Sequence, residues 1–135
     1  MTGLFLMKIP LFFLCEDLRL VDGRLDVIGM MDRIVVRSVP THVDPSHHLR
    51  LAIMAREFSD EPWQVRYMSA DGKTKKFLGQ GFVANPKVQI RLVPLDGLVL
   101  SGCGTAAFEI VTSNEVLARF EFEIALPVTS FRASA

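Results

Sequence analysis

The sequence has few cysteines, no net charge and no long apolar run, and each shortage excludes a class of protein. Its two cysteines, Cys15 and Cys103, are too few for a disulfide framework and lack the spacing of a metal site. Fifteen Lys and Arg residues balance fifteen Asp and Glu residues, so the chain lacks the field that nucleic-acid binders need. No run approaches the roughly 18 apolar residues of a membrane-spanning helix. We therefore expect no nucleic acid, no membrane span and, from the unpaired thiols, a cytoplasmic protein.

The first fifteen residues are apolar and end in a cysteine, as in a bacterial lipoprotein signal. No positive charge precedes the first apolar run, Lys8 and Pro10 interrupt it, and bulky Leu14 stands before the cysteine. We therefore interpret this segment as part of the mature protein, for which Met1 and Met7 are both candidate native starts.

The overall composition is that of one globular domain. The chain has 135 residues, of which half are apolar and 22% are charged. No repeat, low-complexity segment or linker divides it. We expect a single domain over residues 1–135.

Apolar and polar residues alternate with a period of two along most of the chain, which is typical of strands with one face in water. The alternation is clearest over residues 49–56, 63–67, 87–92 and 116–126. It assigns one face of each strand to the core: Leu49, Leu51, Ile53, Ala55, Trp63, Val65, Tyr67, Val88, Ile90, Leu92, Val116, Ala118, Phe120, Phe122, Ile124 and Leu126.

Turn residues lie between these runs. Asp22-Gly23 and Asp71-Gly72 suit two-residue hairpin loops, and Ser113-Asn114 suits a third hairpin. Alternation of wet and dry faces favours antiparallel over parallel sheets. The sequence thus predicts an all-β fold, a two-sheet antiparallel β-sandwich of the immunoglobulin-like or C2-like kind with about eight or nine strands.

The densest group of candidate ligands is His42, Asp44, His47 and His48, on a loop between two strands. Imidazole and carboxylate groups suit a transition metal, and the loop would then bind a metal or a small ligand, with hydrolysis as one outcome. The spacing matches no metal motif, however, and further ligands are unidentified, so a polar surface loop is the competing interpretation. We predict no cofactor.

The cysteines and glycines have structural interpretations. Glu16 and Asp17 raise the pKa expected for Cys15, which favours a buried, unreactive thiol. Cys103 lies in Ser101-Gly102-Cys103-Gly104, which we interpret as a turn or bulge rather than a nucleophile elbow. Gly79 and Gly81 indicate a bulge.

One basic cluster follows the second hairpin turn. Lys73, Lys75 and Lys76 lie near Trp63 and Tyr67 in the predicted hairpin, and a nucleic-acid stacking platform would need such groups. The alternation places the two aromatic residues in the core. We therefore predict that the lysines solvate an edge strand.

Two segments carry a family resemblance. FLCEDLRL (13–20) and VDGRLDVIGMMDRIVV (21–36) contain a Cys-acidic strand, a glycine hairpin and a Leu-x-x-Ile-Gly strand before a Pro-bearing loop. In these features the chain resembles an uncharacterised bacterial family of small β-sandwich proteins. At the final hairpin, Gly104-Thr105-Ala106 replaces the usual glycine-aromatic start. The resemblance implies a sandwich fold and carries no activity or functional residues.

Two functions are compatible with these observations. The first is a non-enzymatic interaction module that binds a protein partner or forms a homo-oligomer, most simply a dimer, with the apolar residues 3–14 at the interface or exchanged. The alternative is a small-ligand or metal-binding domain, hydrolytic in one version, that uses the loop from His42 to His48.

Overall fold

The computed structural model describes residues 11–55, 63–73, 75–81, 89–113 and 115–127. These residues form twelve strands and one 3-10 turn, η1 (Pro45–His47), so the predicted all-β fold is confirmed. No helix in this part of the chain has the length and hydropathy to cross a bilayer. The strands are β1 (Leu11–Cys15), β2 (Asp17–Val21), β3 (Arg24–Ile28), β4 (Arg33–Val35), β5 (Thr41–His42), β6 (Arg50–Ala55), β7 (Trp63–Met68), β8 (Lys75–Gly81), β9 (Gln89–Pro94), β10 (Val99–Leu100), β11 (Gly104–Val111) and β12 (Val116–Ala125).

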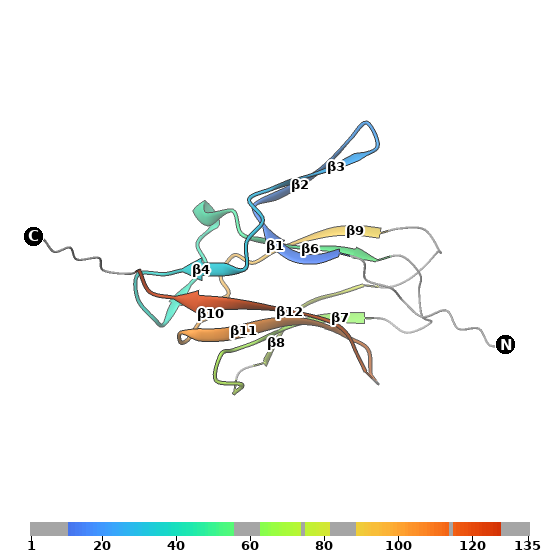
Figure 1. Cartoon of the computed structure of the whole chain (residues 1–135). Coiled ribbons are helices and arrows are strands. Elements are labelled where there is room, and N and C mark those ends of the chain that lie inside the picture. The colour runs from blue at the N-terminus through green and yellow to red at the C-terminus, as the bar shows by residue number, and fades with distance from the viewer. Residues whose placement is uncertain (1–10, 56–62, 74, 82–88, 114, 128–135) are drawn as a thin grey trace, which may run out of the picture.

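Two sheets form the layers of a sandwich-like fold (Figure 1). The three-stranded sheet has the order β1-β6-β9, and the five-stranded sheet has the order β4-β12-β11-β7-β8. Pairing is antiparallel, except that β4 runs parallel to β12 with Ile34 beside Ile124. Two small sheets, β2-β3 and β10-β5, complete the described strands. The immunoglobulin-like or C2-like order stays a prediction.

The core lies between the two layers and follows the predicted alternation. Trp63, Val65 and Tyr67 of β7 are each only 1% exposed. Tyr67 packs on Phe108, which stacks on Phe122 with ring centroids 4.9 Å apart. Aromatic contacts of this kind stabilise a core beyond the burial of area alone. From the three-stranded sheet the core receives Leu14, Leu51, Ile53 and Val93.

The alternation of β12 holds in the middle of the strand and fails at its ends. Phe122 and Ile124 are buried as predicted. Val116 and Leu126 are 48% and 46% exposed, so their assignment to the core was wrong. Both lie at or beyond the limits of the strand, Val116 as its first residue and Leu126 one position after its end.

The predicted inward face of β9 was wrong. Val88 lies outside the described residues, Ile90 is 38% exposed, and Leu92 packs on a smaller apolar cluster away from the main core. Val93 is buried instead, at 8% exposure, and the exposed Arg91 places its guanidinium carbon 5.5 Å from the centroid of the Trp63 ring. Both faces of this strand carry apolar side chains, so alternation could not identify the inner one.

The three predicted hairpins are confirmed. Asp22 and Gly23 both have positive φ (49° and 76°) in a two-residue loop between β2 and β3. The connection of β7 to β8 begins at residue 69, so the two-residue loop expected at Asp71-Gly72 was wrong. Within the connection the Asp71 carboxylate accepts hydrogen bonds from the Ser69 hydroxyl at 2.6 Å and the Lys73 amide at 2.9 Å. The bulge predicted near Gly79 is also present, since the register of β8 shifts there.

Candidate functional site

The loop of the candidate metal ligands folds as a tight turn. The Asp44 carboxylate accepts a hydrogen bond from the Ser46 amide at 2.9 Å, and the His48 amide donates to the Pro45 carbonyl at 3.1 Å. Asp44 therefore caps the turn η1, as short polar side chains commonly do. His48 has a φ of 50° and is exposed.

Three of the four candidate side chains, those of His42, Asp44 and His48, are described, and the metal site stays a prediction. No group of three or more His, Cys, Asp or Glu side chains that could hold a metal ion occurs within the described ranges. The His47 side chain lies outside them. His42 is the last residue of β5 and pairs with Val99 of β10, so it belongs to a strand and not to the turn.

A cavity of about 440 Å³ includes the predicted residue His42 in its wall. The volume falls within the range of small-molecule pockets, about 300–1,000 Å³. Strands β4 and β5 and the residues around them form the cavity. Its lining consists of Met31, Arg33, Ile34, Val35, Val36, Arg37, Thr41, His42, Val43, Leu49 and Leu100.

The lining of this cavity divides into apolar and cationic parts. Val43, Leu49 and Leu100 are buried members of the main core. Arg33 and Arg37 are exposed and carry the formal charge. The sequence did not predict either arginine as a site residue, because both lie in the short segment around β4, where apolar and polar residues do not alternate.

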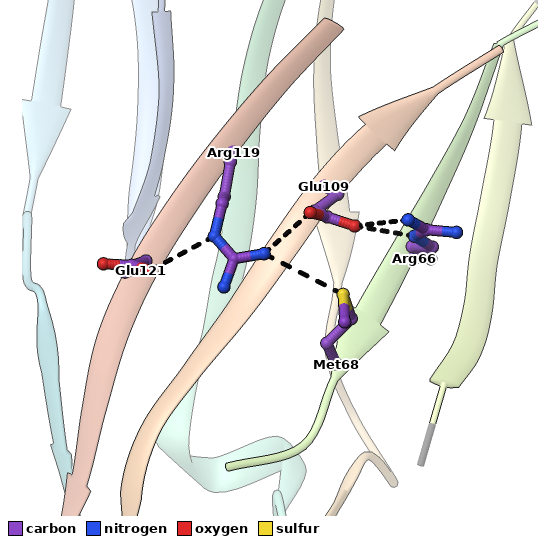
Figure 2. Close-up of polar contacts among 5 residues, drawn as sticks. All are labelled: Arg66, Met68, Glu109, Arg119 and Glu121. Atoms are coloured by element: carbon purple, nitrogen blue, oxygen red, sulfur yellow. Dashed lines mark hydrogen bonds and ion pairs between the residues drawn. The ribbon is translucent and has the colours of Figure 1, made fainter. Parts of the chain in front are cut away.

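A second polar cluster lies on the outer face of the five-stranded sheet (Figure 2). The Glu109 carboxylate of β11 accepts hydrogen bonds from Arg66 of β7 and from Arg119 of β12, each at 2.7 Å. Arg119 also donates to Glu121 at 3.2 Å, and its Nη1 lies 3.9 Å from the Met68 sulfur. The cross-strand register places these charges side by side, so reading each strand separately could not find them.

Glu109 is ionised and is held between the guanidinium groups of Arg66 and Arg119. Its residue is only 5% exposed, and burial acts to raise the pKa of the carboxyl group. The hydrogen bonds and charges of Arg66 and Arg119 outweigh burial, so the pKa of Glu109 lies below its ordinary value. A carboxylate held by two guanidinium groups is poorly suited to proton transfer near neutral pH, and we assign it a structural role.

The two thiols occupy different environments. Cys15 ends β1 and is fully buried, as predicted; burial first, and the Asp17 carboxylate next, raise the pKa of its thiol. Cys103 lies between β10 and β11, as predicted, and is exposed. Both are free cysteines.

The basic cluster after β7 is separated from the two aromatic residues that a stacking platform would need. Lys73, Lys75 and Lys76 are exposed on or next to β8, at the edge of the five-stranded sheet. Trp63 and Tyr67 are buried in the core and offer no free ring face to a base. The predicted division between solvating lysines and core aromatics is confirmed.

A model of a family of unknown function matches residues 10–125, which is most of the chain. The predicted resemblance to an uncharacterised family is thus confirmed, while the bacterial origin of that family stays a prediction. No curated protein matches the sequence. The comparisons therefore assign no activity to the chain.

Proposed function

Because the chain belongs to DUF6941, a family of unknown function, we propose a function from its geometry: residues 1–135 form a non-enzymatic domain that self-associates through the free edge of β3. Two free cysteines, one of them exposed, support a location in the reducing cytoplasm. The observation that carries the proposal is the hairpin of β2 and β3.

This hairpin rises away from the three-stranded sheet (Figure 1). Its strands pair only with each other among the described strands. A two-stranded hairpin is marginally stable in water, whereas three or more strands with an apolar face are stable. Strands added from another molecule would therefore stabilise it.

One face of the hairpin is apolar. Leu18 and Val27 lie opposite each other in the register, and Leu25 shares their face. Leu18 packs on the cluster of Phe13, Cys15 and Ala52. Val27 is 39% exposed, so the apolar face extends beyond what the chain itself covers.

The charges of the free edge favour a second copy of this chain as the occupant. Arg19 bonds Asp17 within β2 at 2.9 Å. The side chains of Arg24 and Asp26 on β3, by contrast, have no hydrogen bond or ion pair with another described residue. If two β3 strands pair antiparallel about Leu25, Arg24 of each copy lies opposite Asp26 of the other. This two-fold arrangement is self-complementary and gives a four-stranded sheet.

The apolar N-terminus, predicted as the interface, contributes less to the proposal. Phe13 and Leu14 are buried within their own chain. Residues 3–10 lie outside the described residues. The proposed contact of the dimer therefore lies in the hairpin of β2 and β3.

Charge reversal tests the proposal. Arg24→Asp and Asp26→Arg each replace two attractive pairs by two repulsive ones in a homodimer, and we expect the dissociation constant to rise about tenfold or more. An equimolar mixture of the two variants restores opposite charges and should dimerise like the wild type. Light scattering over a concentration series measures all four samples.

Three outcomes would count against the proposal: a wild-type monomer at every concentration, unchanged dimers in both variants, or no recovery in the mixture. Removal of residues 1–7 is the further control. If that truncation alone abolished the dimer, the contact would lie in the N-terminus and not in the hairpin.

A second candidate function is small-ligand binding in the cavity beside β4. The cavity of about 440 Å³ with His42 in its wall favours it. Titration calorimetry with small amphipathic compounds tests this function, and the absence of any binding would contradict it. The metal version remains a proposal for the loop of His42, Asp44, His47 and His48, which elemental analysis of the purified protein would test.

A further inference from the structure

The interior of the cavity beside β4 is apolar. Val43, Leu49 and Leu100 are each no more than 4% exposed and belong to the main core. Met31 and Val36 are partly buried and pack on the same core. A ligand in this cavity would therefore place an alkyl or aryl group against the core, and burial of apolar surface would drive its binding.

The lining of the cavity carries uneven positive charge. Arg33 lies 3.3 Å from the Glu123 carboxylate, which offsets its charge. Arg37 has no hydrogen-bond or ion-pair partner within the part of the chain that the structure describes. His42 adds ring nitrogens that can donate a hydrogen bond. The cavity thus offers one uncompensated guanidinium group.

The edge of β4 supplies backbone donors at the same place. Asp32 and Val36 bond to β12, through the Asp32 carbonyl and the Val36 amide, each at 2.9 Å. Because backbone groups of successive residues point to opposite sides of a strand, those of Arg33 and Val35 point away from β12. Both residues also line the cavity. Backbone N–H groups beside a guanidinium group favour an anionic oxygen.

We infer that this cavity binds a small monocarboxylate with an apolar body, its carboxylate on Arg37 and the amide groups of the β4 edge and its alkyl or aryl part against the core. The inference rests on the second proposed function, small-ligand binding in the same cavity. One free guanidinium group matches one negative charge. A cationic ligand would be repelled by Arg37, and an uncharged one would leave that group unused.

Three probes of equal chain length test the ligand class: hexanoate, hexan-1-ol and hexylamine, titrated into the full chain by calorimetry. We expect hexanoate to bind about tenfold or more tightly than hexan-1-ol, and hexylamine to bind most weakly. Arg37→Met keeps the length of the side chain and removes its charge. It should lower hexanoate affinity to the level of hexan-1-ol, while the exposed-site control Lys76→Met should leave it unchanged.

The outcomes separate the inference from the function on which it rests. Equal binding of hexanoate and hexan-1-ol would overturn the carboxylate class and leave small-ligand binding standing. Hexanoate binding that Arg37→Met does not weaken would overturn this site. Absence of binding by all three probes would overturn both. Circular dichroism of the Arg37→Met protein checks that its strands are intact.

Discussion

The guanidinium group of Arg66 on β7 and the carboxylate of Glu109 on β11 form a two-donor contact, with Nε and Nη2 each 2.7 Å from the same oxygen. Two strands far apart in the sequence thereby hold a nearly buried negative charge on the outer face of the five-stranded sheet. Arg119 holds the other carboxylate oxygen from the opposite side. Ion pairs thus link three neighbouring strands of the sheet, in addition to the backbone hydrogen bonds between them.

Glu109→Gln should destabilise the protein by about 1–3 kcal/mol, because two guanidinium groups lose their charged acceptor. Glu121→Gln is the matched control, since its side chain is 59% exposed and meets Arg119 alone at 3.2 Å. We expect the control to cost less than about 1 kcal/mol. Urea unfolding of the three proteins measures both values, and equal losses would show that burial of Glu109 contributes nothing special.

Acid should weaken the wild type more than Glu109→Gln. Burial opposes ionisation of Glu109, but the hydrogen bonds of Arg66 and Arg119 prevail, so its folded pKa lies below the unfolded value of about 4.3. The stabilisation is therefore complete above about pH 5 and is lost as pH falls through the folded pKa. Unfolding midpoints measured from pH 6 to pH 3 should converge for the two proteins. Parallel curves would contradict this pKa shift.

Gly29→Ala should destabilise the fold by about 1–3 kcal/mol. Gly29 has a φ of +68°, and a β-carbon there would meet Cγ of Glu16 at 2.6 Å. Gly102→Ala is the control, because a β-carbon at that position meets nothing within 4 Å. Thermal unfolding compares the two variants with the wild type. A neutral Gly29→Ala would show that the segment after β3 relaxes freely.

The thiols should differ in reactivity. Cys103 is exposed, whereas Cys15 is fully buried and its thiol has a pKa raised by burial and by Asp17. A thiolate-selective reagent should therefore modify one group per chain in the native protein and a second only after unfolding. Cys103→Ser should abolish the fast reaction. Rapid modification of two thiols in the native chain would contradict the burial of Cys15.

Alternation predicted the parts of the fold where one face of a strand is wet. In β7 the residues Trp63, Val65 and Tyr67 are buried and Gln64 and Arg66 are less so, as a period of two requires. The hairpin loop at Asp22-Gly23 was predictable because few residues adopt positive φ readily. In these cases local chemistry is enough.

Other parts depend on contacts that a single segment cannot reveal. In β9 the alternation assigned the wrong face of the strand to the core, because Leu92 has apolar neighbours on the outer face of its sheet. The short strand β4 has too few residues for a period, and its partner β12 lies far along the chain. Long-range pairing decides both cases.

One residue of the predicted loop site lines the cavity, and the metal site itself stays a prediction. His42 does lie in the wall of a cavity, but its companions there are Arg33 and Arg37 and not the remaining residues of its loop. The loop was predicted as a site because its histidines are close in sequence. The cavity, by contrast, depends on how β4 and β5 lie relative to each other in the fold. The sequence showed which residue types could bind a ligand, but it did not show which residues lie beside His42 in the folded chain.

The parallel pairing of β4 with β12 has a consequence for synthesis of the protein. Arg33 pairs with Glu123, ninety positions further along the chain. On the ribosome, β4 must therefore wait for nearly all of the later strands before it can join its sheet, and chaperones could bind its apolar residues during that delay. β12, the last of the described strands, thus completes the pairing of a strand near the start of the described chain.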